Sequence, residues 1–286
     1  MKKICKSIYA HVHLLFSTLI SILSAILFSS LSKANKIKKL ANVNQTTTCS
    51  ILANGPSLRS VLEENHEQFF NQDLFVVNFF AHSVYFQILK PKYYVITDNI
   101  FFKEDYSENV NKLREAFNTI NWDIILWIPT GRDNARFIKE VKQNRFVKIM
   151  HYNMTPIKAY RSLEYFMYKH NLGMPRPQNV SNTSIFLAIN LHYKTINLYG
   201  ADHSWLKTLY VNDDNQVCFE DVHFYDNKAR NRQGDIGKLS FLLSLYVMAF
   251  DTHLRLQDYA QHLGVEILNH TSGSYIDAYK RVKSNA

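Results

Sequence analysis

Short apolar runs alternate along this chain with longer stretches in which apolar residues recur every three or four positions. The runs have the length and composition of buried β-strands and lie at residues 50–53, 74–78, 93–97, 123–128, 147–150, 195–199 and 265–268. The periodic stretches predict helices at residues 58–70, 83–89, 107–117, 134–143, 159–170 and 183–192. Strands that alternate with helices need crossover connections, which place parallel strands side by side. The pattern therefore predicts a Rossmann-like α/β domain over residues 49–286, with a mostly parallel sheet and helices on both faces.

Residues 201–235 interrupt this alternation. The segment combines aromatic, acidic and basic residues with weak strand patterns only at 209–211 and 217–219. A long connection of this kind in a compact domain is typical of a functional lid, and its aromatic content argues against disorder. The adjacent acids Asp213 and Asp214 fit a hairpin turn. After this lid, residues 238–263 predict an apolar helix, with a possible break near Asp251, that packs on the sheet or on a second copy of the chain.

The amino terminus carries an uncharged apolar stretch over residues 14–31, without Pro or Gly, between two groups of lysines. We interpret residues 1–32 first as a membrane anchor, single-pass or tightly docked, that contacts the bilayer through residues 8–31. A cleaved signal peptide and a buried core helix are the alternatives. Ser17, Ser21 and Ser24 fall on one face of this helix. The following polar, lysine-rich residues 33–48 predict an aperiodic tether.

The net charge of +9 lies almost entirely in the first 40 residues, which hold seven lysines and no acid. The rest of the chain is close to neutral, so we expect no nucleic-acid partner. The widely spaced Cys5, Cys49 and Cys218 indicate neither a disulfide framework nor a zinc site. Reduced cysteines fit a membrane-associated protein whose domain lies on the cytoplasmic side of the inner membrane.

The most informative turn follows the first predicted strand and reads Asn54-Gly55-Pro56-Ser57. Gly55 permits a tight turn, Pro56 has a φ suited to a first helical residue, and Ser57 is a typical helix cap. Free amides at a helix start, just beyond the carboxyl end of a strand, are a common site for phosphates and nucleotides.

Other polar residues fall at the same predicted edge of the sheet. These are Asn78 after the second strand, Asp98 and Asn99 after the third, Ser181, Asn182 and Thr183 at the start of the sixth helix, and Asp202 and His203 after the sixth strand. Asn and Ser side chains offer donors and acceptors without charge, which suits a sugar, a ribose or a nucleobase.

The sequence lacks the usual motifs of metal-dependent nucleotide-sugar enzymes and of other common nucleotide enzymes. It contains no Asp-x-Asp triplet, no Walker loop and no G-x-G-x-x-G, so no metal is expected. His223, with Glu220, Asp221 and Asp226 nearby in the sequence, is the first candidate for a general base, and His203 is the second. Side chains expected to contact a leaving phosphate are Tyr225, Lys228, Arg230 and Arg232.

Three segments together resemble the metal-independent bacterial sialyltransferases of glycosyltransferase family 42. They are ILANGPSL at 51–58, VVNFF at 76–80 and SNTSIFLAINLHYKTINLYGAD at 181–202. The chain is also similar to capsule and flagellin glycosyltransferase-like domains, and the NGPS turn occurs in proteins similar to hydroxymethylpterin pyrophosphokinases. The resemblance covers about residues 49–202, with a weaker tail over 265–279.

The resemblance implies roles for individual residues. Asn54 and Asn78 match the two asparagines that contact the cytidine nucleotide in the family, and Asp202 matches the Asp of its G-x-D motif. The other implied donor-binding residues are Asp98 or Asn99, Ser181 or its neighbour, and the lid tyrosines Tyr210 or Tyr225. A lid histidine is the catalytic base in the family, with His223 as the counterpart.

These observations predict a metal-independent glycosyltransferase that moves an acidic, sialic acid-like sugar from a CMP-activated donor to a glycan or glycolipid acceptor. An anchor close to the domain suits lipooligosaccharide or capsule synthesis. A pterin-type pyrophosphokinase and a non-catalytic nucleotide-sugar-binding envelope protein remain as alternatives.

Overall fold

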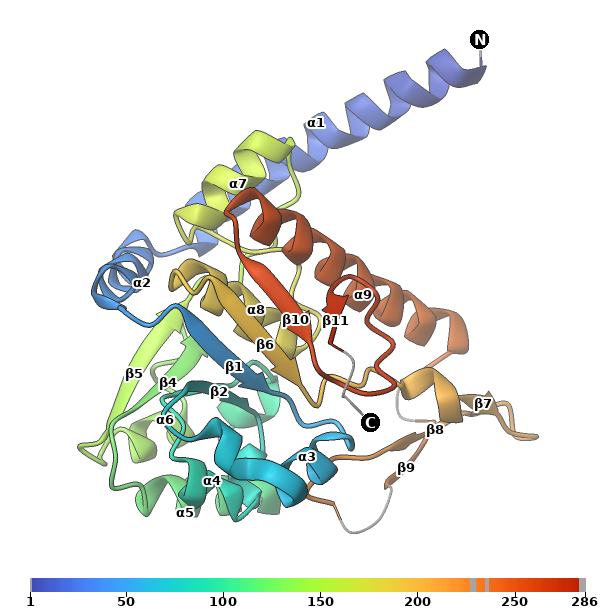
Figure 1. The fold of residues 1–286 in the computed structure, drawn as a ribbon. Coiled ribbons are helices and arrows are strands. Elements are labelled where there is room, and N and C mark those ends of the chain that lie inside the picture. Colours follow the sequence, from blue (N-terminus) through green and yellow to red (C-terminus); the bar gives the residue numbers. More distant parts are fainter. Residues whose placement is uncertain (1, 227–229, 235–236, 283–286) are drawn as a thin grey trace.

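A computed structural model describes residues 2–226, 230–234 and 237–282, of which residues 2–7 and Arg230 are described by their backbone alone. Its centre is an eight-stranded sheet with the order β11-β10-β6-β1-β2-β3-β4-β5 (Figure 1). Every neighbouring pair in this sheet is parallel. The strands are β1 Thr48–Leu52, β2 Asp73–Val77, β3 Tyr93–Val95, β4 Ile124–Pro129, β5 Val147–Tyr152, β6 Thr195–Tyr199, β10 Glu266–Asn269 and β11 Lys280–Arg281. The predicted α/β class and parallel sheet are confirmed.

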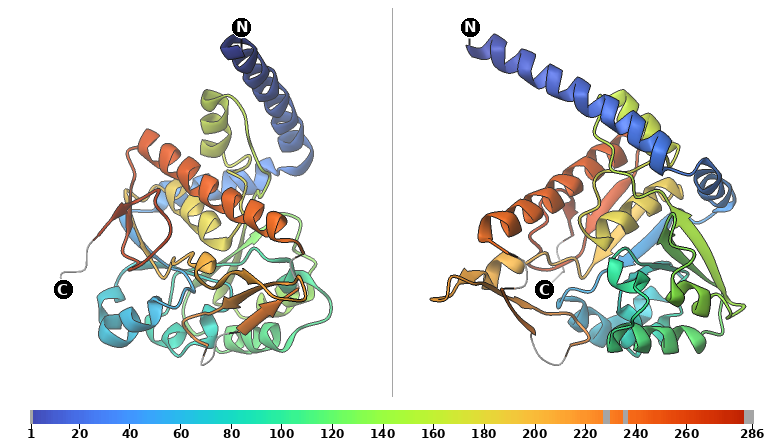
Figure 2. Two further views of the ribbon diagram at one scale, coloured as in Figure 1. Left: turned by 90° about the vertical axis from the view of Figure 1, so that its right-hand side faces the viewer. Right: turned by 180° about the vertical axis from the view of Figure 1, so that it is seen from behind.

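Helices cover both faces of the sheet (Figures 1 and 2). One face holds α3 Leu58–Asn65, α4 Tyr85–Leu89, α5 Glu108–Asn118 and α6 Arg136–Val141, with the short 3-10 helices η1 His66–Phe69, η2 Phe80–His82 and η3 Asn99–Phe102. The other face holds α2 Leu31–Val43, α7 Arg161–Lys169, α8 Val180–Asn190 and α9 Leu239–His262. Successive strand residues feed the two cores alternately, as Ile51 and Leu52 do in β1. This double burial explains why the strands are continuous apolar runs.

The predicted lid is largely structured. Helix η4 Trp205–Thr208 is followed by a separate antiparallel sheet of β7 Tyr210–Val211, β8 Val217–Asp221 and β9 Arg230–Gln233. The Asp213-Asp214 turn joins β7 to β8, which confirms the predicted hairpin. The lid is tied to the first turn of the domain, because the Phe224 amide donates to the Asn54 carbonyl (3.1 Å). Arg59 of α3 adds hydrogen bonds to the carbonyl oxygens of Phe224 and Asp226.

Two local predictions are wrong. The aperiodic tether over residues 33–48 is mostly helix α2, in which Ala34, Ile37 and Ala41 are buried at helical spacing. Its exposed lysines are Lys36, Lys38 and Lys39. The possible break near Asp251 does not occur, since α9 continues through it, and Asp251 pairs with Arg255 one turn later (2.8 Å).

The amino-terminal helix α1 Lys2–Phe28 extends from one side of the domain, and its first half projects beyond α7 (Figures 1 and 2). Its residues Ile8–Phe28 are long and apolar enough to cross a membrane by length and composition. Cys49 and Cys218 are buried free thiols, whereas the side chain of Cys5 lies outside the described residues.

Candidate functional site

A pocket of about 310 Å³ opens at the carboxyl ends of β1, β2, β3 and β6. We call it the strand-end pocket. It lies between β1 and β6: strands β2 to β5 follow β1 on one side, whereas β6, β10 and β11 lie on the other side. This is the switch point at which open α/β sheets generally bind ligands. Of the predicted site residues, the pocket is lined by Asn54, Gly55, Pro56, Asn78, Asp98, Ser181, Asp202, His203 and His223.

Asn54 and Asn78 each bring an amide into the pocket. Asn54 Nδ2 donates to the Val77 carbonyl (3.1 Å), and Asn78 Nδ2 donates to Asp98 Oδ2 (2.9 Å). Within the described part of the chain, the Oδ1 atoms of both asparagines are buried and have no hydrogen-bond partner. Asn78 also has a positive φ of 46°, a conformation that Asn tolerates better than most residues. Buried acceptors are normally satisfied, so these two oxygens are candidate acceptors for donors on a ligand.

The start of α3 is not the phosphate site that the NGPS turn predicts. The Gly55 N–H donates to the Gly200 carbonyl (2.8 Å), so it is already used within the fold. A Cβ at position 55 would lie 2.0 Å from Asp202 Oδ2, so glycine is needed here for close packing. Asp202 accepts from the Ser57 N–H (3.3 Å) and the Ser57 hydroxyl (2.8 Å). The Asp202 carboxylate therefore caps α3, in place of Ser57, and occupies the place where an anion would bind.

Helix α8 supplies a different helix start. Its cap is Asn179, whose Oδ1 accepts from the Asn182 N–H (2.9 Å) and from the Ser181 hydroxyl (2.6 Å). Gln178, Asn179, Val180 and Ser181 line the pocket. The first amides of a helix have no intrahelical partners and favour negative charge. Asn182 and Thr183, also predicted as donor-binding residues, do not line the pocket, because they are fully buried inside the domain.

His203 sets the position of Asn179. It is buried, has a φ of 49°, and lies 2.9 Å from Asn179 Nδ2 and 3.0 Å from His253 Nε2. His253 continues the network to Tyr279 (2.8 Å) and Asn182 (3.1 Å). Burial lowers the pKa of His203 to about 3. It also lowers the pKa of His253, to which the neighbouring His203 contributes. Both rings are thus neutral at physiological pH.

This burial makes folding sensitive to acid. The unfolded chain takes up a proton on His203 near pH 6.5, whereas the folded chain does so only near pH 3. The stability from a neutral His203 is therefore complete above pH 6.5 and is lost as the pH falls below it. Between pH 7 and 5 we expect the free energy of unfolding to decrease by about 2 kcal/mol from this residue.

Urea unfolding at both pH values measures this effect in the wild type, in His203→Asn and in His170→Asn, which changes an exposed histidine. The His203 variant should lose about 2 kcal/mol of the pH-dependent change, and the His170 variant should behave as the wild type. An equal pH-dependent change in all three proteins would contradict this assignment.

His223 stands in the wall of the pocket and is half-buried. Its Nδ1 lies 3.1 Å from Asp226 Oδ2, and its Nε2 lies 4.0 Å from Asp221 Oδ1. Because a carboxylate accepts hydrogen bonds, Asp226 favours the proton on Nδ1 and leaves Nε2 with a lone pair. The ring also stacks on Tyr225, with centroids 5.2 Å apart. In this tautomer the basic nitrogen of His223 is Nε2.

The remaining predicted contacts lie elsewhere. Asn99 accepts from Arg132 (2.8 Å) outside the pocket, and Ser57 is engaged by Asp202. Tyr225 lines a second hollow with His82, Asn109 and Lys112. Lys228 and the Arg230 side chain lie outside the described residues. Arg232 and Tyr210 do not line the strand-end pocket.

The pocket wall carries more negative than positive charge. Its carboxylates are Asp98, Asp202, Glu220 and Asp221, and Lys207 is the only lysine or arginine among the described residues that line it. Burial raises the pKa of both Asp98 and Asp202, while hydrogen bonds from Asn78 and Ser57 oppose this. Within the part of the chain that the structure describes, no three His, Cys, Asp or Glu side chains form a group that would hold a metal ion.

Sequence reasoning missed several residues of this pocket, above all Gln178, Asn179 and Lys207. The Asn179 cap had a visible signal, since Asn directly before an apolar helical stretch is a typical helix start. Lys207 had none, because the sequence of the lid around it shows no regular apolar pattern.

No family model and no curated protein matches this chain. Among solved structures it is similar to the MAf glycosyltransferase from Magnetospirillum magneticum AMB-1, with 12% sequence identity and a TM-score of 0.52. The match covers 85% of this chain but only 35% of that one, so this chain corresponds to about a third of its neighbour. At this identity the match shows a shared fold.

Proposed function

We propose that this protein is a glycosyltransferase that moves an acidic sugar from a CMP-activated donor to a glycan or glycolipid acceptor. The observation that carries the proposal is the pair of buried, unpartnered amide oxygens of Asn54 and Asn78 in a pocket at the switch point of the sheet. Amino groups of a cytosine and hydroxyl groups of a ribose are suitable donors to such oxygens. The glycosyltransferase fold of the structural neighbour supports the same reaction class.

The donor phosphate and the sugar carboxylate need positive partners in a pocket with four carboxylates. Lys207 and the first amides of α8 serve this purpose in our proposal. No metal ion is part of this mechanism.

The transfer itself is a single displacement. His223 Nε2 takes the proton of the acceptor hydroxyl, and the acceptor oxygen bonds to the anomeric carbon. The bond from that carbon to the phosphate oxygen breaks, and CMP leaves with the electron pair. Asp226 stabilises the imidazolium that forms.

The helix α1 and the basic amino terminus support association with a membrane, on the cytoplasmic side in our proposal. This location gives access to lipid-linked intermediates of surface polysaccharides such as capsule or lipooligosaccharide.

A second candidate is phosphoryl transfer of the pterin pyrophosphokinase type. The observation that favours it is the set of carboxylates in the pocket wall, because Mg²⁺ binds to one or two carboxylates together with substrate phosphates.

Release of CMP from a CMP-activated acidic sugar, with EDTA or with Mg²⁺, separates the candidates. We expect turnover that changes less than about twofold on addition of EDTA, since charge is balanced by protein groups. AMP formation from ATP with a pterin-like alcohol and Mg²⁺, without CMP release from the sugar donor, would favour the pyrophosphokinase candidate. CMP binding without any turnover would identify a non-catalytic binding protein.

A further inference from the structure

Helix α1 buries polar side chains and exposes apolar ones, which is the reverse of a helix on a water-soluble domain. Among its side chains from Ile8 onward, the buried ones are Thr18 and Ser21, which are 6% and 4% exposed. Phe16, Ile26 and Leu27 are 65%, 72% and 64% exposed. The other exposed apolar side chains from Ile8 to Leu31 are Ile8, Tyr9, Val12, Leu15, Leu19, Ile20, Ile22, Leu23, Phe28 and Leu31. The face with Thr18 and Ser21 thus contacts the domain, and the apolar side chains point away from it. Such a large exposed apolar surface calls for an apolar partner.

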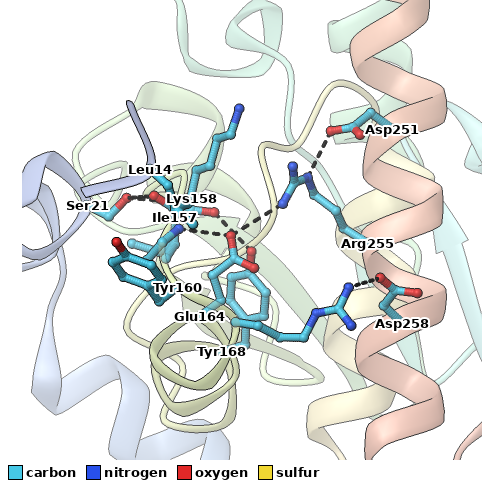
Figure 3. Close-up of polar contacts among 12 residues, drawn as sticks. Leu14, Ser21, Ile157, Lys158, Tyr160, Glu164, Tyr168, Asp251, Arg255 and Asp258 are labelled. Carbon is cyan, nitrogen blue, oxygen red and sulfur yellow. Dashed lines mark hydrogen bonds and ion pairs between the residues drawn. The ribbon is translucent and has the colours of Figure 1, made fainter. Parts of the chain in front are cut away.

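The contact between α1 and the domain is specific. The Ser21 hydroxyl donates to the Lys158 carbonyl (3.0 Å) and accepts from the Lys158 N–H (2.9 Å). Thr18 Oγ1 accepts from the Tyr160 N–H (3.1 Å), and its own proton goes to the Leu14 carbonyl (2.8 Å). Figure 3 shows Ser21 facing the loop that contains Lys158 and Tyr160.

The contact extends beyond the end of α1. The Ser29 hydroxyl lies 2.8 Å from Thr155 Oγ1, and Asn153 exchanges hydrogen bonds with both backbone groups of Ser30. If α1 left the domain, several of these groups would lose their partners. The second half of the helix is therefore fixed to the domain.

Charged side chains lie directly beside this contact (Figure 3). Glu164 accepts from the Ala159 N–H (2.9 Å) and pairs with Arg255 (3.3 Å). Arg161 pairs with Asp258 (3.0 Å), and these two side chains are 73% and 49% exposed. Hydrocarbon strongly disfavours such groups. A bilayer that enclosed α1 from Thr18 to Phe28 on all sides would enclose them too.

The part of the apolar stretch that precedes the contact is too short to cross a bilayer. Residues 8–17 form about 15 Å of helix, half of the roughly 30 Å hydrocarbon core. While it is docked, α1 cannot span the membrane.

We propose that α1 is an interfacial helix that lies along one leaflet of an anionic bilayer, with its apolar surface in the acyl chains and its hydroxyl face on the domain. Charge supports a lipid partner: α2 follows directly and exposes Lys36, Lys38 and Lys39, and the first 40 residues contain no acid. The inference does not depend on the proposed reaction.

The test uses the full chain with an amino-terminal peptide tag, added to preformed vesicles of phosphatidylcholine with and without phosphatidylglycerol. The expected result is binding that is stronger to the anionic vesicles, with a tag that added protease removes without detergent. A bound protein whose tag is protected would overturn the proposal, because the helix would then span the bilayer. A protein that ignores vesicles and dimerises through α1 would also overturn it.

Two single substitutions that add the same charge refine the test. Leu19→Glu changes the outer face of α1, and Val84→Glu changes an exposed apolar residue directly before α4, on the other side of the sheet. Leu19→Glu should weaken vesicle binding at least tenfold and Val84→Glu should not change it. Equal effects of the two variants would contradict insertion of the outer face.

Discussion

Replacement of His223 by Gln is expected to lower the turnover number by about 10²- to 10⁴-fold, the usual contribution of a general base. Gln keeps an amide that can donate to Asp226 but has no basic nitrogen for the acceptor proton. Because His223 lies in the wall that faces the acceptor in our mechanism, the affinity for CMP should not change. Initial rates of CMP release with acceptor present, together with CMP titrations, measure both quantities.

His203→Asn is the matched comparison, since His203 lines the same pocket. A ring with a pKa of about 3 is a weak base at neutral pH. Because His203 contacts Asn179, the cap of α8, we expect it to hold the start of that helix in place. We expect this variant to raise KM more than it lowers kcat. Turnover of His223→Gln within threefold of the wild type, or a larger loss of kcat in His203→Asn, would remove His223 from the role of base.

The sheet was predictable because parallel strands that are buried on both faces have continuous apolar sequences. All seven predicted strands lie in the observed sheet, and β11, of only two residues, is too short to leave such a pattern. Helix α2 was not predicted because its buried face consists of only Ala34, Ile37 and Ala41 among polar and basic residues. Its helical form follows from packing on the domain rather than from an obvious apolar stripe.

The edge of the sheet was predictable for a topological reason, since polar residues after parallel strands must gather there. Asn54, Asn78, Asp98 and Asp202 indeed share the pocket. Their hydrogen bonds were not predictable, because they depend on which distant side chains the tertiary structure places next to them. Asp202, 145 residues away from Ser57, occupies the helix start that the NGPS turn offers to a phosphate. A turn shows that amides are available, but the tertiary structure decides whether a ligand reaches them.

The second large effect concerns the two asparagines. Asn54→Ala and Asn78→Ala should each raise the Kd of CMP about tenfold, because each removes one acceptor that no group of the described residues satisfies. Asn99→Ala is the control. Asn99 is next to Asp98 in the sequence, but its side chain accepts a hydrogen bond from Arg132 outside the pocket. Its Kd should equal that of the wild type.

The most direct measurement is thermal unfolding of the wild type and these three variants with CMP, UMP, GMP and ATP in the presence of EDTA. At a concentration of 100 times its Kd, CMP should stabilise the folded protein by about 2.7 kcal/mol, more than the other nucleotides do at the same concentration. Asn54→Ala and Asn78→Ala should weaken this shift, and Asn99→Ala should retain it. No shift with CMP, or a CMP shift that is unchanged in both Asn54→Ala and Asn78→Ala, would contradict the claim that these amides bind a nucleotide.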